Sequence, residues 1–403
     1  MTTRVVQIAE SEHSGAVASV PKGYKQTDVG LIPQDWKVIT IAQIAPLQRG
    51  YDLPKQFIKE GPYPVVYSNG VINYHDTAMV HGPGVVTGRS GTLGRVHYIE
   101  SDYWPHNTSL WVTSFNGNIP QFVFYLYTAI GFERFSSGSG VPTLNRNDAH
   151  SFRVALPPTK AEQEAIAEAL SDTDALIESL EQLIAKKRQI KLGTMQELLT
   201  CKKRLPGFSK AWEASPLRRF VRQFIVPMRD KPKCFTGNIP WCRIEDFDGT
   251  YLRDSKSGQY VDIETIRTMN LKVYPTGTLL VSCSADLGRC AIVDQPLVSN
   301  QTFIGLEMDQ TVSSTLFFYY FMSYRAQELN NLSSGTTISY LSREEFEEFI
   351  VFVPFDRKEQ IEIAQIFSDM DAEITLLEVK LGKARLIKQG MVQELLTGRI
   401  RLV

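Results

Sequence analysis

The clearest pattern in the chain is a hydrophobic repeat with a period of seven residues near its C-terminus. Successive members are separated by four and three residues in turn, and Lys388 is the one polar member of the series Ile363, Phe367, Met370, Ile374, Leu377, Leu381, Ala384, Lys388, Met391 and Leu395. This spacing puts a narrow apolar stripe on one face of a helix, as in a coiled-coil seam. A helix of about 40 residues is roughly 60 Å long. The pattern predicts a long helix that packs against a similar partner.

A suitable partner lies in the same chain. Residues 157–205 align with residues 354–402 without a gap, and 24 of the 49 positions are identical. The earlier seam keeps Ile166, Leu170, Ile177, Leu180, Ile184 and Leu198 but is broken at Thr173, Lys187, Lys191 and Thr194. Each segment begins with a proline, which is favourable at a helix start. We predict two long antiparallel helices that form a coiled coil; two amphipathic helices, each packed on its own domain, are the alternative.

Two longer segments precede the helices and differ more from each other. Short runs rich in Val, Ile, Tyr and Thr alternate with Asn-Gly, Gly-Pro and Ser-Gly pairs, which predicts strands and turns. One helix is predicted over Phe122–Phe135 and another over Thr315–Leu329. The fold class is therefore α+β, with a pseudo-twofold internal repeat. The predicted parts are an N-terminal extension over 1–22, globular domains over 23–156 and 205–353, and helical regions over 157–204 and 354–403.

Composition excludes several classes of protein. The 403 residues are 43% hydrophobic and 22% charged, which argues against wholesale disorder. No apolar run is long enough for a membrane span, and Met1–Gly23 lacks the apolar core of a signal peptide, so the cytoplasm is the expected location. The five cysteines form no CxxC pair, so neither a disulfide framework nor a metal site is expected, and the nearby Cys283 and Cys290 do not change this.

The net charge of −1 hides a strong asymmetry along the chain. Residues 201–260 carry 13 Lys and Arg against 6 Asp and Glu, whereas residues 340–380 carry 4 against 11. A balanced total is therefore compatible with a basic face that binds an acidic partner.

Three repeated features carry a resemblance to a known family. They are the opening Ile32-Pro33-Gln34-Asp35-Trp36, the junction from Pro157 to Glu162-Gln163, and the Gln-Glu-Leu-Leu-Thr endings at Gln196–Thr200 and Gln393–Thr397. In this order, and with the duplication, the chain from about Gly23 to Val403 resembles the specificity subunit of type I restriction–modification systems.

The resemblance implies a function and a set of partners. The globular parts would be target-recognition domains, each reading one half of a split, asymmetric site in double-stranded DNA. The helices would set the spacing and dock two copies of a modification (methyltransferase) subunit, with restriction subunits as further partners and no membrane. The chain itself would be a non-catalytic subunit without cofactors, and S-adenosylmethionine, ATP and Mg²⁺ would belong to the partner subunits.

Missing motifs agree with a non-catalytic chain. The sequence has no methyltransferase tetrapeptide, no cofactor-binding glycine loop and no Walker motif. Two rival hypotheses stay open: a coiled-coil scaffold whose domains bind proteins, and an enzyme with an unfamiliar site. DNA binding would weaken steeply with salt, which separates the leading hypothesis from the scaffold.

Candidate DNA contacts in the first domain lie on three loops rich in glycine, hydroxyl and amide groups. Such side chains reach base edges and phosphates. The alternative is a set of plain turns with surface arginines. The candidates are Arg89, Ser90, Thr92, Arg95, His106, Asn107, Thr143 and Arg146.

The second domain offers a basic cluster and counterparts of the same loops. Arg229, Lys231 and Lys233 would contact phosphates, while Arg243 and Arg253 would alternatively pair with Glu245 and Asp254. The other candidates are Ser284, Arg289, Asn300, Gln301, Thr337 and Tyr340. For subunit docking we expect exposed apolar side chains near the helix ends, at Leu198, Leu199, Leu395 and Leu396.

Overall fold

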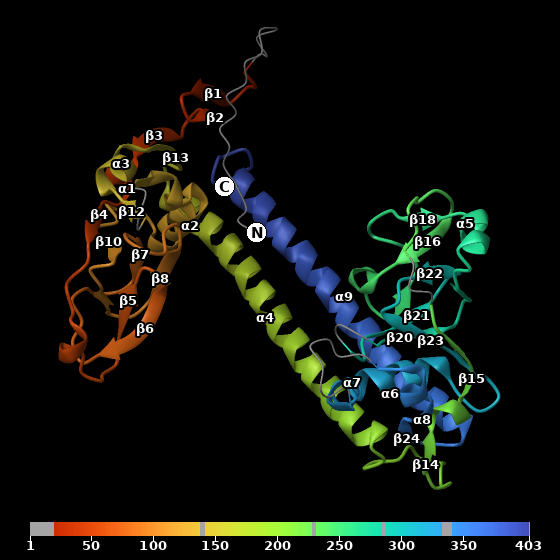
Figure 1. Cartoon of the computed structure of the whole chain (residues 1–403). Helices are drawn as coiled ribbons and strands as arrows, with labels where there is room; N and C mark the ends of the chain where they lie inside the picture. Colours follow the sequence, from red (N-terminus) through yellow and green to blue (C-terminus); the bar gives the residue numbers. More distant parts are fainter. Residues whose placement is uncertain (1–19, 138–141, 228–230, 284–286, 333–340, 403) are drawn as a thin grey trace. The chain divides into compact units, whose positions relative to one another are not determined.

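The computed structural model describes residues 20–137, 142–227, 231–283, 287–332 and 341–402 (Figure 1). The chain forms two compact units. The first unit comprises residues 1–182 and 378–403, and the second comprises residues 183–377. Each unit therefore combines one globular domain with half of each long helix.

The two predicted helices are confirmed as α4 (Lys160–Leu199) and α9 (Arg357–Leu395). In the first unit, Asp174 and Glu181 of α4 pair with Lys388 and Arg385 of α9, at 2.5 Å each. In the second unit, Lys187 and Lys191 pair with Glu373 and Asp371, at 2.7 and 2.5 Å. In both units the α9 number falls as the α4 number rises, so the helix halves pack antiparallel. Knobs-into-holes packing of a coiled coil stays a prediction.

Burial follows the predicted seam closely. Every seam position of both helices is buried or half-buried, including the polar ones, whereas most neighbouring positions are exposed. The polar seam residues have partners: the Thr173 hydroxyl donates to the Ala169 carbonyl at 2.9 Å, and the seam lysines pair with carboxylates. The breaks in the hydrophobic pattern are therefore polar contacts between or within helices and do not interrupt the helices.

The first domain is built from small antiparallel and mixed sheets with α2 packed against one of them (Figure 1). The largest sheet has the order β4 (Leu47–Arg49), β10 (Ser109–Val112), β7 (Gly84–Gly88), β8 (Val96–Ile99). A second sheet has the order β6 (Gly70–His75), β5 (Tyr63–Tyr67), β9 (Trp104–Pro105). Two-stranded pairs are β1 (Tyr24–Thr27) with β2 (Gly30–Pro33), β3 (Lys37–Thr40) with β13 (Arg153–Leu156), and β11 (Ser136–Ser137) with β12 (Thr143–Leu144). The helices are α1 (Ile41–Ile44), η1 (Lys55–Phe57), α2 (Pro120–Ile130), η2 (Phe132–Phe135) and α3 (Arg146–Ser151).

The second domain repeats this plan, and its two main sheets contain more strands. One sheet has the order β15 (Val221–Ile225), β23 (Phe303–Met308), β20 (Leu279–Ser282), β21 (Cys290–Val293), β17 (Tyr251–Leu252). The other has the order β18 (Tyr260–Val261), β16 (Ile239–Cys242), β22 (Leu297–Ser299), β19 (Val273–Tyr274), and β14 (Glu213–Pro216) pairs with β24 (Ile350–Val353). The helices are η3 (Leu217–Arg219), η4 (Ile244–Asp246), α5 (Ile263–Thr268), α6 (Thr315–Tyr324), α7 (Ala326–Leu332) and α8 (Arg343–Glu348). Both domains thus contain the mixture of strands and helices that the sequence predicts.

Both predicted domain helices are shorter than expected. The helix expected over Phe122–Phe135 ends at Ile130, because Gly131 adopts a left-handed conformation with φ of 69° and the chain continues as the short 3₁₀-helix η2. The helix expected over Thr315–Leu329 is divided at Arg325 into α6 and α7. A hydrophobic pattern does not reveal such local breaks.

A buried carboxylate at the start of each long helix joins three parts of its unit. In the first unit, Glu162 is 1% exposed and accepts hydrogen bonds from Trp36 Nε1 at 3.3 Å and Arg401 Nη2 at 2.9 Å. In the second unit, Glu359 is equally buried and accepts from Trp212 Nε1 at 3.3 Å and Arg204 Nη2 at 2.9 Å. These two carboxylates with their donors are called the glutamate clamps below.

The neighbouring glutamines attach each long helix to a domain helix. Gln163 Oε1 accepts from the backbone N–H of Ile119 at 3.0 Å, and Gln360 Oε1 accepts from that of Ser314 at 2.8 Å. Ile119 and Ser314 are the N-cap residues of α2 and α6. The Glu-Gln pair of the junction motif therefore has a structural role in both units.

The clamps lead to a stability prediction. Glu359→Ala should lower the free energy of unfolding by about 3 kcal/mol, because it leaves the Arg204 and Trp212 donors without their acceptor. The matched control is Glu164→Ala, whose side chain lies on an exposed face of α4 and should change stability little. Urea unfolding of the full chain measures both effects, and equal stability of the two variants would contradict a role for the clamp.

Candidate nucleic-acid interface

The three loops singled out in the first domain lie together at one end of its main sheet. The Arg89 backbone N–H donates to the Thr108 carbonyl at 2.8 Å, and the Arg89 carbonyl accepts from the Leu144 N–H at 2.8 Å. Gly91 N–H donates to the Pro142 carbonyl at 3.3 Å. Loops that are separate in the sequence thus form one surface, and we call residues 49–52, 88–95, 106–108 and 142–146 the first loop edge.

The predicted contact residues of this domain all lie on the first loop edge. Ser90 forms a β-bridge with Thr143, and the Arg95 carbonyl accepts from the Thr87 hydroxyl at 2.9 Å. The Thr92 carbonyl packs where a Cβ on Gly88 would stand, at 1.9 Å, so only glycine fits at position 88. Arg95 and Arg146 are exposed, and Arg89 is half-buried. The edge therefore presents several cations on a rigid backbone.

Sequence reasoning missed the segment that follows β4. Arg49 Nη2 lies 3.3 Å from Asp52 Oδ1, and the Asn107 side-chain amide donates to the same carboxylate oxygen. The backbone of the segment is fastened to the 106–108 loop, since Gly50 N–H donates to the Ser109 carbonyl at 3.0 Å and Tyr51 N–H to the Pro105 carbonyl at 2.8 Å. No motif marks this segment, because its importance depends on a contact between residues 55 positions apart.

His106 holds the turn and does not present a cation. Its ring lies against Tyr67 with ring centroids 4.1 Å apart, and its Nδ1 accepts from the Thr108 N–H at 3.3 Å. Burial lowers the pKa of His106, and the negative charge of Asp52 partly opposes this shift. The histidine is therefore neutral at pH 7. Its imidazole supports the loop that carries Asn107.

The second domain repeats the same junction. Cys283 N–H donates to the Thr302 carbonyl at 2.8 Å, and the Cys283 carbonyl accepts from the Leu341 N–H at 2.9 Å. Asn300 Oδ1 accepts from the Thr302 N–H at 3.3 Å, as His106 Nδ1 does from Thr108. Residues 243, 282–283, 287–289, 299–302 and 341 form the second loop edge, and Gln301 is exposed on it.

Two predicted arginines of the second domain lie on this edge. Arg289 donates from Nη2 to the Phe247 carbonyl at 3.0 Å. Arg243 follows β16, which runs parallel to β22 with Cys242 opposite Ser299. Arg243 also pairs with Glu245 at 3.6 Å, whereas Arg253 pairs with Asp294 at 2.9 Å and not with Asp254. The predicted Arg229, Ser284, Thr337 and Tyr340 lie outside the described residues.

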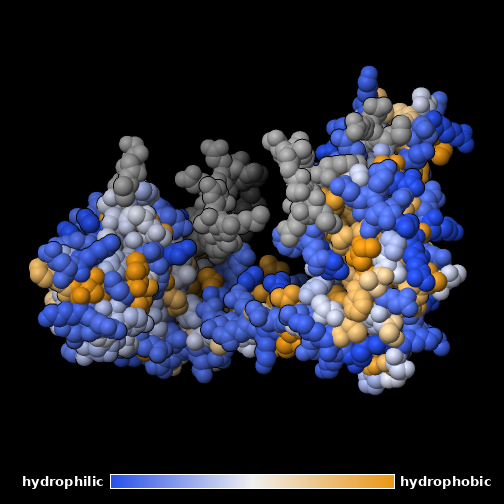
Figure 2. Space-filling model, turned by 60° about the horizontal axis from the view of Figure 1, so that its bottom comes forward, coloured by the Kyte–Doolittle hydropathy of each residue, from blue (hydrophilic) through white to orange (hydrophobic). Residues whose placement is uncertain are grey.

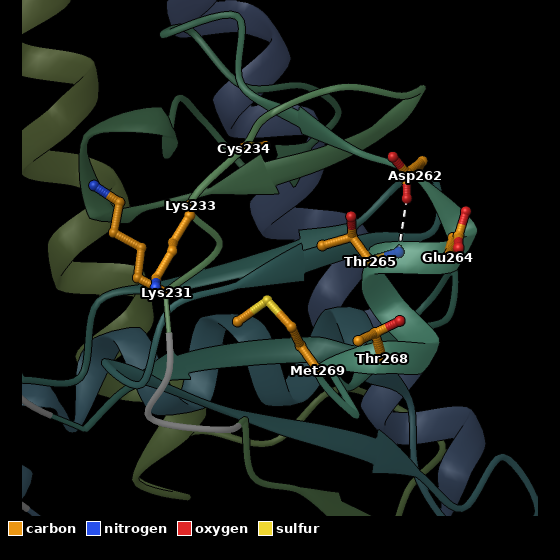
Figure 3. A pocket seen from close by; sticks show the side chains of 8 residues that line it. All are labelled: Lys231, Lys233, Cys234, Asp262, Glu264, Thr265, Thr268 and Met269. Atoms are coloured by element: carbon orange, nitrogen blue, oxygen red, sulfur yellow. Dashed lines mark hydrogen bonds between the residues drawn. The ribbon is translucent and has the colours of Figure 1, made fainter.

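Lys231 and Lys233 do not join the second loop edge, so the predicted basic cluster is separate from the other candidates. They line a shallow pocket whose opposite wall is α5, with Asp262 and Glu264 (Figure 3). Asp262 follows β18, which pairs with the start of β16, whereas Arg243 follows its end. The nearby acidic groups weaken the case for a phosphate contact at this pocket.

The leucines expected to be exposed for docking are buried, and that expectation is wrong. Leu198 and Leu199 are 4% and 3% exposed in the core of the second unit, and Leu395 and Leu396 are 5% and 6% exposed in the core of the first. The seam continues at each helix end into the core of a domain.

Other apolar side chains of the helices are exposed. In the face shown in Figure 2, hydrophobic patches interrupt the hydrophilic surface of the helices. On the long helices of the first unit, the exposed large apolar side chains are Leu176, Val379, Leu386 and Ile387. Those of the second unit include Leu183, Ile190, Leu192 and Leu376. We call these two sets the outer helix surfaces.

Two cysteines of the second domain, Cys283 and Cys290, lie in its hydrophobic core. Cys283 and Cys290 are buried, and burial raises the pKa of each thiol to about 12. Across the described ranges, no cluster of three or more His, Cys, Asp and Glu side chains is arranged to hold a metal ion. In the same part of the chain, no helix has the length and apolar character needed to cross a bilayer.

Comparison with known proteins identifies the class to which this architecture belongs. The family model of the type I restriction modification DNA specificity domain matches twice, over residues 33–188 and 227–384. The chain therefore belongs to this family of type I restriction–modification specificity subunits.

One relative matches along most of the chain and another along part of it. A putative type I restriction enzyme MjaX specificity subunit of Methanocaldococcus jannaschii is 21% identical over 94% of this chain and 97% of its own length. The EcoprrI specificity subunit of Escherichia coli is 26% identical over 39% of this chain and 40% of its own. The crystal structure of the S subunit of a type I system from M. genitalium has a TM-score of 0.63 at 17% identity, covering 90% of this chain and 96% of that one. The likeness to the solved structure shows a shared fold.

The tight backbone of the first loop edge leads to a second prediction. A Cβ on Gly50 would lie 2.2 Å from the His106 carbonyl oxygen, so Gly50→Ala should destabilise the first unit by about 1–3 kcal/mol. Gly193→Ala is the control: this helical glycine has open space around it and should gain roughly 0.5–1 kcal/mol. Thermal unfolding compares the two variants, and a gain in stability in both would refute the predicted contact.

Proposed function

We propose that each loop edge reads one half of a split DNA site. The observation that supports this most strongly is the repeated junction, in which the same three loops are joined by equivalent backbone hydrogen bonds in both domains. The junctions bring arginine and amide side chains to one surface of each domain. Such groups contact phosphates and base edges in the major groove.

The two half-sites should differ in sequence, which makes the whole site asymmetric. Equivalent positions carry different side chains: Arg89 corresponds to Cys283, and Asn107 corresponds to Gln301. Because base readout depends on donor and acceptor groups, the same frame with different groups recognises different bases. The long helices would then set the separation of the two half-sites.

The outer helix surfaces are the proposed docking sites for two copies of a modification subunit. Each unit exposes several large apolar side chains on its helices, which favours burial by a partner. Gly193 and Gly390 occupy equivalent places in the two helices, and neither has a described neighbour within 4 Å of a Cβ position. Glycine costs stability in a helix, so its presence in both copies is consistent with close approach of a partner chain.

The chain would contribute recognition, and the chemistry would lie in the partners. We propose that methyl transfer from S-adenosylmethionine and ATP-driven, Mg²⁺-dependent cleavage belong to modification and restriction subunits. The role of this chain is to hold them at the DNA sequence that its two domains select.

Methylation sequencing of cells that express the chain with its modification subunit tests the function. We expect one split, asymmetric motif with modified adenine. The control is the modification subunit expressed without this chain, which should modify no such motif. An assembled complex that yields no motif, and whose DNA binding does not weaken between 50 and 200 mM salt, would favour the protein scaffold over DNA recognition.

The docking surface can be tested on the second unit. Leu183→Glu combined with Ile190→Glu should leave the chain folded, because both side chains are exposed, but weaken binding to the modification subunit by at least about 30-fold. Gln189→Glu is the control on the same exposed helix. Co-purification and binding measurements report the result. Unchanged affinity of the double variant would exclude this surface as the docking site.

A further inference from the structure

We infer that Asn107 reads an adenine base in the half-site of the first domain, and that Asp52 is the residue that orients the Asn107 amide for this contact. The inference rests on the proposed function and adds the reading residue, its positioning partner and the base. The Asp52–Asn107 contact is its structural basis.

The orientation of the amide follows from the chemistry of its partner. An ionised carboxylate accepts hydrogen bonds and donates none, so the NH₂ group of Asn107 must face Asp52. This contact fixes which end of the amide is which, a choice that heavy-atom positions alone leave open. The Asn107 Oδ1 is then turned away from the carboxylate, and one N–H of the NH₂ group remains for a second partner.

An oriented asparagine amide of this kind matches adenine. Adenine presents the N7 acceptor beside the N6 donor in the major groove, and an Asn amide pairs with both through its N–H and its Oδ1. Guanine presents two acceptors at the same edge, which an amide oxygen does not satisfy. The side chain of Asn107 therefore selects adenine over guanine.

Asp52 acts from a backbone that holds it firmly. Its segment is bound to the 106–108 loop by the Gly50 and Tyr51 hydrogen bonds, and Gly50 has no space for a side chain. Sites on rigid backbone place a reading group more accurately than mobile loops do. Asp52 thus belongs to the same rigid body as the residue that it orients.

Charge also favours a positioning role for Asp52. Its side chain is 70% exposed, so an unpaired carboxylate there would repel approaching phosphates. Arg49 lies 3.3 Å away and offsets this charge, and the Arg49–Asp52–Asn107 group is neutral overall. Neutrality lets the group approach the bases while neighbouring arginines contact the backbone.

The test measures base discrimination by the full chain in complex with its modification subunit. Equilibrium binding is measured on a panel of duplexes in which each base of the modified motif is replaced in turn. In Asn107→Ala, discrimination for adenine should fall by about 5- to 150-fold at one position of one half-site, with the other half-site unchanged. Asp52→Asn should relax the same position by a smaller factor.

Matched variants separate reading from structure. Gln26→Ala removes an exposed amide on the β1–β2 hairpin and should leave every position unchanged. Gln301→Ala should relax a position in the other half-site. Asn107→Asp keeps the size of the side chain but sets a second carboxylate against Asp52, and the two like charges repel, so the preference for adenine should be lost.

Two results would overturn the inference itself, and a third would refute the proposed function on which it rests. If Asn107→Ala lowered the binding affinity equally for every duplex, Asn107 would have a structural or phosphate-contacting role. Loss of a cytosine preference in Asp52→Asn, with Asn107→Ala unaffected, would assign reading to Asp52 itself. A wild-type complex without any discrimination would instead refute the proposed function, and this outcome is distinct from the other two.

Discussion

The fold depends on two buried carboxylates, Glu162 and Glu359. A carboxylate without partners is costly to bury, so each one requires donors from elsewhere in its unit. The donors are a tryptophan at the start of the domain and an arginine beyond the end of a long helix. In the second unit this arginine is Arg204, which follows the end of α4. In the first unit it is Arg401, which follows the end of α9. The residues after each long helix thus complete one of the two clamps.

A constant frame with variable surfaces follows from this arrangement. The clamps tie each long helix to the rest of its unit, and the Gln163 and Gln360 contacts attach it to a domain helix. Backbone hydrogen bonds, which do not depend on side-chain identity, then hold the loops of each loop edge. Side chains on the loop edges can therefore differ between the domains without loss of the frame, which is what the proposed reading of two unlike half-sites requires.

The sequence predicted the helices and their seams well because periodicity reports burial directly. Even the polar seam positions Lys191 and Lys388 are half-buried and paired. Periodicity shows that a residue is buried but does not show whether its own domain or a partner buries it. The expectation that Leu198 and Leu395 contact a partner is therefore wrong, because their own domains bury them. Asp52 was missed because its role comes from loops that meet only in three dimensions. Whether the loop edges bind DNA stays a prediction.

Adjacent residues on the loop edges have different roles, which under the proposed function would let specificity vary. His106 and Asn300 each place an acceptor atom on the N–H of a threonine two residues later, so an imidazole and an amide serve equally well in closing the turn. The next residue, Asn107 or Gln301, then projects from a turn whose geometry is already set. Because turn closure and the proposed base reading fall to different residues, the side chain at position 107 or 301 can change without disturbing the turn.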